Sequence, residues 1–177
     1  MIQARLKMRS RTAQSGEGGK ALRARGFSLI ELLVVVAVIL IIAAIAIPNF
    51  VRSKLRANEA SAVSSLRSIT TAEVVYSTTY QVGYSPSLTA LGGSGAVIGQ
   101  GNAGLIDSVL SSGSKSGYSF TYSATSSDSN GNILTYTANA DPVLAGTTGD
   151  THFYVDETSI IRSNPNTAAG PNDTPVN

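Results

Sequence analysis

GFSLIELLVVVAVILIIAAIAIP, residues 26–48, is the stretch that decides the architecture of this chain. Between Phe27 and Ile47 only Ser28 and Glu31 are polar, and the first proline of the chain, Pro48, ends the run. A helix of these 21 residues covers about 31 Å, close to the roughly 30 Å hydrocarbon core of a bilayer. The run therefore predicts an apolar helix that can cross a membrane once.

The charge on the two sides of this run differs. Residues 1–26 carry seven cations and one acid, a net charge of +6, whereas the rest of the chain carries six cations and ten acids, a net charge of −4. Basic flanks stay on the cytoplasmic side of a membrane, so we expect the N-terminus in the cytoplasm and everything after Pro48 outside. A basic head of this kind indicates an addressing or topology segment, and we infer no direct nucleic-acid binding from it.

Three interpretations of the run compete: a cleaved secretory signal with Ala44-Ile45-Ala46 as the cleavage site, a plain membrane anchor, and a filament subunit. Glu31 distinguishes them. A carboxylate within an apolar helix costs about 2.5–3.5 kcal/mol on insertion scales, and neither a signal nor an anchor has a use for it. The helical pattern also continues past Pro48, which a cleaved signal does not require. These observations favour the filament subunit.

Residues 25–35 (RGFSLIELLVV), together with AAIAIP at residues 43–48, resemble the N-terminal signature of type IV prepilins and type II secretion pseudopilins. The resemblance covers about residues 23–57. It implies that a prepilin peptidase cuts between Gly26 and Phe27, that Phe27 is then N-methylated, and that residues 1–26 are a basic leader. The absence of a Cβ at Gly26 lets a protease approach the backbone closely.

The resemblance also implies roles in assembly for Glu31 and Pro48. The carboxylate of Glu31 would meet the new N-terminal amine of a neighbouring subunit, which penalises a wrong stagger because an unpaired charge in an apolar bundle is costly. Pro48 stands at the usual proline of the family, where we expect a kink or a locally loosened helix. The sequence departs from the family at Leu40, where many members have glycine.

The helix is expected to continue to about Tyr80, broken or bent at Pro48, and residues 49–84 form its amphipathic half. The apolar positions of this half follow helical spacing and are expected to pack on a globular head; they are Leu55, Ala62, Leu66, Ile69, Tyr76 and Tyr80. Residues 85–117 are predicted to be the variable αβ loop of the family, with a short helix possible at residues 105–110.

Strand patterns follow this loop. Residues 118–122, 133–140, 152–155 and 160–162 are predicted strands, with a hairpin turn at Asn130-Gly131. Residues 118–162 are therefore an antiparallel head, and residues 163–177 are expected to be a loose tail. The predicted fold class is α+β and pilin-like: a long N-terminal helix whose second half packs on a small antiparallel sheet.

Enzyme motifs are missing from the sequence. It has no P-loop, nucleophile elbow or cysteine, and His152 is its single histidine, so we expect a protein that is not an enzyme and has no catalytic residues. We also expect no cofactor. Calcium is the one metal considered, because pseudopilins of the major type place a calcium site in a late loop, and Asp141, Asp150 and Asp156 could supply oxygen ligands. Their spacing matches no calcium-loop motif.

These observations lead to the hypothesis of a type IV pilus subunit precursor. It would be stored in the inner membrane and polymerised by a cytoplasmic ATPase and a platform protein, and the surface fibre would serve adhesion, twitching motility or DNA uptake. The alternatives are a major-type pseudopilin of a type II secretion system, whose filament is periplasmic, and a membrane-anchored binding domain that never polymerises.

Overall fold

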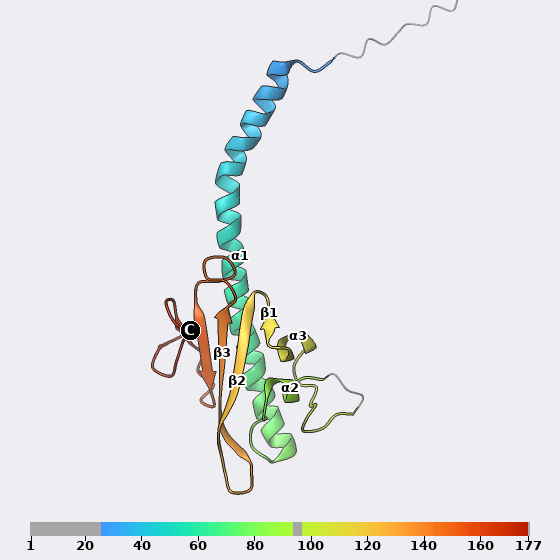
Figure 1. Ribbon diagram of the computed structural model, residues 1–177, viewed down its shortest axis with the longest axis vertical. Helices are drawn as coiled ribbons and strands as arrows, with labels where there is room; N and C mark the ends of the chain where they lie inside the picture. The colour runs from blue at the N-terminus through green and yellow to red at the C-terminus, as the bar shows by residue number, and fades with distance from the viewer. Residues whose placement is uncertain (1–25, 94–96, 177) are drawn as a thin grey trace, which may run out of the picture. The chain divides into compact units, whose positions relative to one another are not determined.

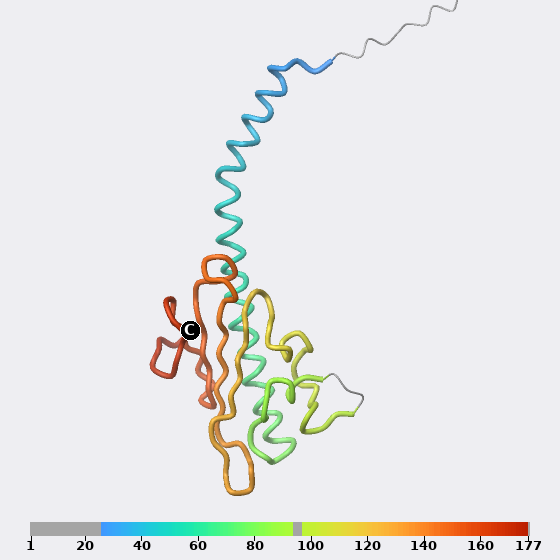
Figure 2. Tube along the Cα trace, viewed as in Figure 1, coloured from blue at the N-terminus to red at the C-terminus, as the bar shows by residue number. Residues whose placement is uncertain are grey.

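The computed structural model describes residues 26–93 and 97–176 (Figures 1 and 2). It divides into two compact units at residue 41, and the second unit holds the globular head. The helices are α1 (Leu29–Tyr80), α2 (Leu88–Leu91) and α3 (Ser108–Ser111). The strands are β1 (Ser114–Lys115), β2 (Tyr118–Ser127), β3 (Ile133–Pro142), β4 (His152–Asp156), β5 (Arg162–Asn164) and β6 (Thr174–Pro175).

The long helix α1 continues through Pro48, so the proline does not break it. Proline has no backbone N–H to donate to the carbonyl four residues earlier, which removes one hydrogen bond from this turn. The side-chain amide of Asn49 adds a donor here, because its Nδ2 lies 3.1 Å from the carbonyl oxygen of Ile45. The contact lies on the carbonyl next to that of Ala44, which is the carbonyl that loses its backbone donor at Pro48.

The second half of α1 packs against the head through the apolar face that its spacing predicts. Ala62, Leu66, Ile69 and Tyr76 are all almost completely buried, and Tyr80 is partly buried against the same core. Their partners are aromatic and small residues of β2, β3 and β4, including Tyr118, Phe120, Ala138, Phe153 and Val155. The core therefore lies between α1 and one face of the sheet, as the α+β prediction requires.

The sheet is a six-stranded antiparallel meander in which each strand pairs with the next one in the sequence. Inward and outward side chains alternate along β3, where Tyr136, Ala138 and Ala140 are buried and their neighbours are more exposed. The predicted strands at residues 118, 133 and 152 begin where the structure places them. The fourth predicted strand, residues 160–162, is observed two residues later as β5.

The β2–β3 hairpin extends as a two-stranded ribbon past its neighbouring strands (Figure 1). β1 pairs only with Tyr118 and Ser119 of β2, and β4 pairs only with residues 137–140 of β3. The turn contains the predicted Asn130-Gly131, and the carboxylate of Asp128 accepts hydrogen bonds from the backbone N–H groups of Asn130 and Asn132. Thr125 and Ser126 hydrogen-bond across the ribbon to Thr135.

The connector between α1 and the sheet is more structured than the expected variable loop. Leu88 and Leu91 of α2 and Leu110 of α3 are buried in the core. The short helix predicted at residues 105–110 is observed as α3, and it starts later because Asp107 is its N-cap, with its side chain accepting from the N–H of Leu110. Asp107 also forms an ion pair with Lys115 at 2.9 Å.

The expected loose tail is wrong for the residues that the structure describes. β6 pairs with β5, and the backbone N–H of Val176 donates to the carbonyl of Ile161. Ala169 is buried and its carbonyl accepts a hydrogen bond from Asn139 on β3. Small side chains and polar bonds fix this segment, so the absence of large aromatic residues was a misleading signal.

Candidate processing and assembly site

The start of α1 is capped by the side chain of Glu31. Ser28 precedes the first helical residue, and its carbonyl accepts the N–H of Leu32 at 3.2 Å. The carboxylate of Glu31 accepts the backbone N–H of Ser28, also at 3.2 Å. This is one half of the capping box that serine and glutamate form at this spacing, and it satisfies an N–H that the helix leaves unpaired. The sequence analysis missed it, although Ser28-Leu29-Ile30-Glu31 carries the signal.

The predicted cleavage residues lie directly before this cap. Gly26 and Phe27 are exposed and precede α1, and an added Cβ at Gly26 would meet nothing within 4 Å. A peptide bond in this position is accessible from its surroundings. Residues 1–25 of the expected leader lie outside the described residues.

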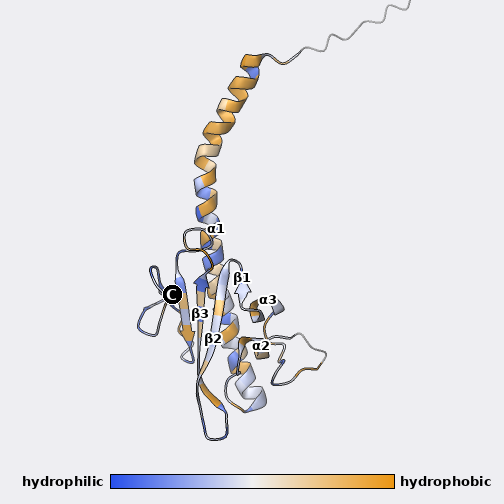
Figure 3. Cartoon of the chain, viewed as in Figure 1, coloured by the Kyte–Doolittle hydropathy of each residue, from blue (hydrophilic) through white to orange (hydrophobic). Residues whose placement is uncertain are grey.

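The apolar first half of α1 presents its side chains outward. Leu29 is 81% exposed, Ile41 is 65% exposed and Phe50 is 70% exposed. Figure 3 shows the hydrophobic colour along this part of the helix. By length and composition α1 is the one described helix that could cross a membrane. Exposed aliphatic surface of this extent is favourable only in lipid or against other apolar helices.

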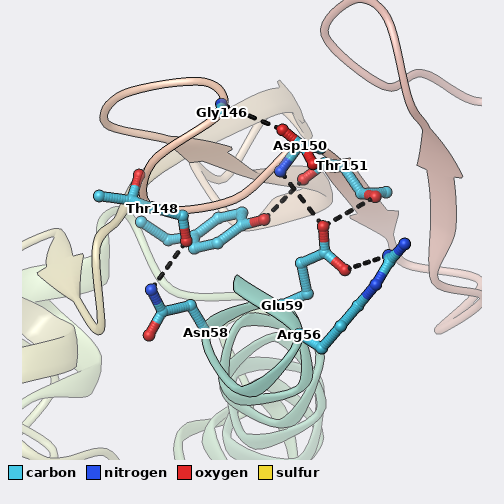
Figure 4. A network of polar contacts seen from close by, with 8 residues as sticks. Arg56, Asn58, Glu59, Gly146, Thr148, Asp150 and Thr151 are labelled. Atoms are coloured by element: carbon cyan, nitrogen blue, oxygen red, sulfur yellow. Dashed lines mark hydrogen bonds and ion pairs between the residues drawn. The ribbon is translucent and has the colours of Figure 1, made fainter. Parts of the chain in front are cut away.

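A polar network joins α1 to the loop between β3 and β4 (Figure 4). One carboxylate oxygen of Glu59, Oε1, accepts the N–H of Asp150 and the hydroxyl of Thr151, each at 3.2 Å. The other oxygen, Oε2, lies 2.7 Å from Nη1 of Arg56. The side-chain amide of Asn58, the residue directly before Glu59 on the same helix, donates to the carbonyl of Thr148 at 2.8 Å. These contacts attach the loop to α1, although the paired residues are about 90 positions apart in the sequence.

Burial of Glu59 would by itself raise the pKa of its carboxyl group. The hydrogen bonds from Arg56, from the Asp150 N–H and from Thr151 oppose that effect and outweigh it, so the pKa lies below its ordinary value. Glu59 is therefore charged in the folded head at neutral pH. Sequence patterns gave no signal for this residue, because a glutamate on an amphipathic helix is usually solvated.

A second carboxylate, Glu73, is completely buried between α1 and the connector. It accepts the backbone N–H of Ser85 at 2.8 Å and the hydroxyl of Ser85 at 2.6 Å. The hydroxyl of Tyr122 donates to the carbonyl of Ser85 at 2.9 Å and so extends the network into β2. Burial raises the pKa of Tyr122 well above its usual range, which keeps this hydroxyl protonated as a donor.

The structure places the calcium candidates in three different settings. Asp141 lies opposite His152 on paired strands, with 2.6 Å between Oδ1 and Nδ1. Asp150 accepts the N–H of Gly146 within its own loop, and Asp156 accepts Thr158 in the turn after β4. Within residues 26–93 and 97–176 no three acidic or histidine side chains gather as a metal site. The structure thus does not bring Asp141, Asp150 and Asp156 together.

Comparison with known proteins supports the assignment of the N-terminal segment. Residues 22–47 match the model of the prokaryotic N-terminal methylation motif. With Gly26 and Phe27 before a capped apolar helix, this segment is similar to the N-terminal segment of type IV prepilins and pseudopilins.

The chain is 51% identical over 51 residues to the type IV major pilin protein PilA of Myxococcus xanthus (strain DK1622). The match covers 29% of this chain and 23% of PilA, so it spans about a quarter of the length of that relative. No solved structure matches the chain.

Proposed function

We propose that the chain is the precursor of a structural subunit of a type IV pilus. The observation that carries the proposal is the capped start of α1, where Gly26 and Phe27 precede a helix whose exposed apolar first half carries a single carboxylate, Glu31. The similarity to a major pilin over its N-terminal segment supports the same function. The role is mechanical rather than catalytic.

The proposed sequence of events begins in the inner membrane, with the N-terminus in the cytoplasm and the head outside. A prepilin peptidase cuts between Gly26 and Phe27, and the new amine of Phe27 is methylated. A cytoplasmic ATPase and a platform protein then move subunits into a fibre, in which the apolar helices exchange lipid for one another. The fibre serves surface adhesion, twitching motility or DNA uptake.

Glu31 has two possible partners in this scheme. In the single chain it accepts the N–H of Ser28, and in the fibre it would pair with the N-terminal amine of another subunit. The capping contact needs only an acceptor oxygen, whereas the pairing with a cationic amine needs the negative charge. Glu31→Gln keeps the first and removes the second, so this variant separates the two roles.

The test is made on cells that produce the full chain. Fibres sheared from the surface are examined by electron microscopy, and the subunit is identified by mass spectrometry with its N-terminus. We expect fibres composed of this chain, a mature N-terminus at methylated Phe27, and a loss of fibres in both Glu31→Ala and Glu31→Gln.

Other outcomes would contradict the proposal in distinct ways. A mature N-terminus at another residue would overturn the processing step. Normal fibres with Glu31→Ala would remove the assembly role of that residue. If deletion of the chain stops protein secretion and surface fibres are absent in the wild type, the chain is a pseudopilin of a type II secretion system.

A further inference from the structure

Two charged side chains of the head are left without a hydrogen bond or ion pair among the described residues from 55 to 176. They are Arg67 on α1 and Glu157 in the turn after β4. Every other charged side chain in this range has a polar partner within the chain. Among the described residues from 55 to 176 the head thus presents one unpaired cation and one unpaired anion, whereas Arg52 and Lys54, which are also without such a partner, lie earlier on α1.

Arg67 lies on the wall of an open groove of about 370 Å³ between α1 and the segment that precedes α3. The apolar part of the lining is Ala72, Val75 and Leu105, and the rest is the hydroxyl groups of Ser64, Ser68 and Thr71. Val75 is 40% exposed even though it lies on the head-packed part of the helix. The groove therefore fits an apolar side chain that is accompanied by a carboxylate.

The turn between β4 and β5 offers that pair of side chains. Glu157 is exposed, and three residues later Ile160 is 43% exposed. The turn is fixed by local bonds: the N–H of Ser159 donates to the carbonyl of Asp156 at 2.9 Å, and the N–H of Thr158 donates to the Asp156 carboxylate at 3.0 Å. It is a preformed projection, so little conformational freedom is lost when it binds.

The groove and the turn lie on different sides of the head and cannot meet within one chain. The groove borders the connector that leads to β1, the first strand of the sheet, whereas the turn joins β4 and β5 near the opposite edge. Figure 2 shows the connector on one side of the β2–β3 pair and the later strands on the other. A contact between them joins two copies through unlike surfaces, and repeated contacts of this type generate open helical polymers.

We infer that the β4–β5 turn of one subunit docks in the α1 groove of a second copy of this chain, with Glu157 against Arg67 and Ile160 against Val75 and Leu105. This inference rests on the proposed function, because it assigns the contact between heads within the fibre. Complementary charges at such a contact fix the register and exclude wrong partners more than they add affinity.

Cysteine cross-linking tests the contact directly, since the natural chain has no cysteine. Val75→Cys and Ile160→Cys are introduced together in the full chain, the fibres are oxidised, and the products are separated without reductant. The expected product is a ladder of disulfide-linked oligomers, because each subunit uses both surfaces. Each single variant is the matched control and should remain a monomer.

Charge reversal supplies an independent measurement. Arg67→Glu and Glu157→Arg should each reduce the yield of sheared fibres by about tenfold, because each juxtaposes like charges at the contact. The two reversals together should restore most of the yield. Membrane levels of the subunit, measured by immunoblot, confirm that each variant is stable.

The outcomes distinguish the contact from the function. Fibres that form in the double cysteine variant without any ladder would overturn the contact and leave the pilus function intact. Dimers formed by Ile160→Cys alone would show a symmetric contact and also overturn it. If the unmodified chain forms no fibre, the proposed function fails, and the contact fails with it.

Discussion

Glu59→Ala should destabilise the head by releasing the β3–β4 loop from α1. The substitution leaves the N–H of Asp150 and the hydroxyl of Thr151 without their acceptor. Hydrogen bonds to a charged group contribute about 1.5–3 kcal/mol each, whereas the ion pair with Arg56 contributes less, because the Arg56 side chain is exposed to water. Allowing for water that reaches the opened site, we expect a loss of about 2–4 kcal/mol in the free energy of unfolding.

Glu59→Gln is the matched control. Both donors from the β3–β4 loop go to Oε1, so an amide oxygen in that place can still accept them. The amide nitrogen then faces Arg56, so the hydrogen bond from Arg56 to Oε2 and the charge interaction are both lost. Because the two hydrogen bonds to Oε1 also lose their charged acceptor, we expect Glu59→Gln to cost about 1–2 kcal/mol, less than Glu59→Ala.

The assay is urea unfolding of the full chain in detergent micelles, followed by the near-ultraviolet circular dichroism of tyrosine. The chain has no tryptophan and its seven tyrosines lie between Tyr76 and Tyr154, so the signal reports the head alone. Equal losses for the two variants, or a loss below about 0.5 kcal/mol for Glu59→Ala, would refute the idea that these hydrogen bonds hold the loop.

The same residue predicts a dependence on pH. Because the folded head lowers the pKa of Glu59 from its ordinary value of 4.5, the resulting stabilisation is complete above that value and is lost as the pH falls through the folded-state pKa. Wild-type stability should therefore fall more steeply below pH 4.5 than that of Glu59→Gln. Parallel pH profiles of the wild type and Glu59→Gln would contradict the assignment of this pH dependence to Glu59.

Three further changes can be measured in the same way. Gly149→Ala should cost about 1–3 kcal/mol, because its Cβ would lie 2.1 Å from the Tyr118 hydroxyl, whereas Gly170→Ala meets nothing within 4 Å and should be nearly neutral. Leu66→Ala should cost about 2–5 kcal/mol, because Leu66 is completely buried in the core; comparable loss in exposed Val74→Ala would argue against a specific cavity effect. Asp107→Ala should cost about 1 kcal/mol through loss of the α3 N-cap. The hydrogen bonds from Lys115 and from the N–H of Leu110 lower the pKa of Asp107 in the fold, so this loss should disappear at low pH. A pH-independent loss would exclude the cap as its cause.

Sequence patterns predicted the elements whose periodicity is strong. The apolar spacing of α1 and the alternation at residues 118–122 follow directly from which side chains are buried. The helix, the strand that begins at residue 118 and the α+β class could therefore be predicted. The N-terminal methylation motif could be recognised because its residues lie together in one short segment. The processing roles of Gly26 and Phe27 and the assembly roles of Glu31 and Pro48 stay predictions.

Long-range polar contacts could not be predicted in this way. Glu59 meets Asp150 and Thr151 only after the sheet has formed, and Glu73 meets Ser85 only because the connector folds back on α1. Neither pairing leaves a period or a motif in the sequence. The ordered C-terminal segment was missed for the related reason that backbone pairing and a buried alanine, rather than large apolar side chains, hold it in place.

The two-stranded ribbon beyond β1 and β4 has a consequence for how this protein can be altered. Its tip, residues 128–132, closes through bonds to Asp128 and contributes nothing to the core cluster. Residues in such a tip can be exchanged or extended at little cost to folding, because the buried contacts of β2 and β3 lie behind them. In the proposed fibre, a peptide epitope grafted there would be carried by every subunit, which makes the hairpin a suitable position for a display sequence.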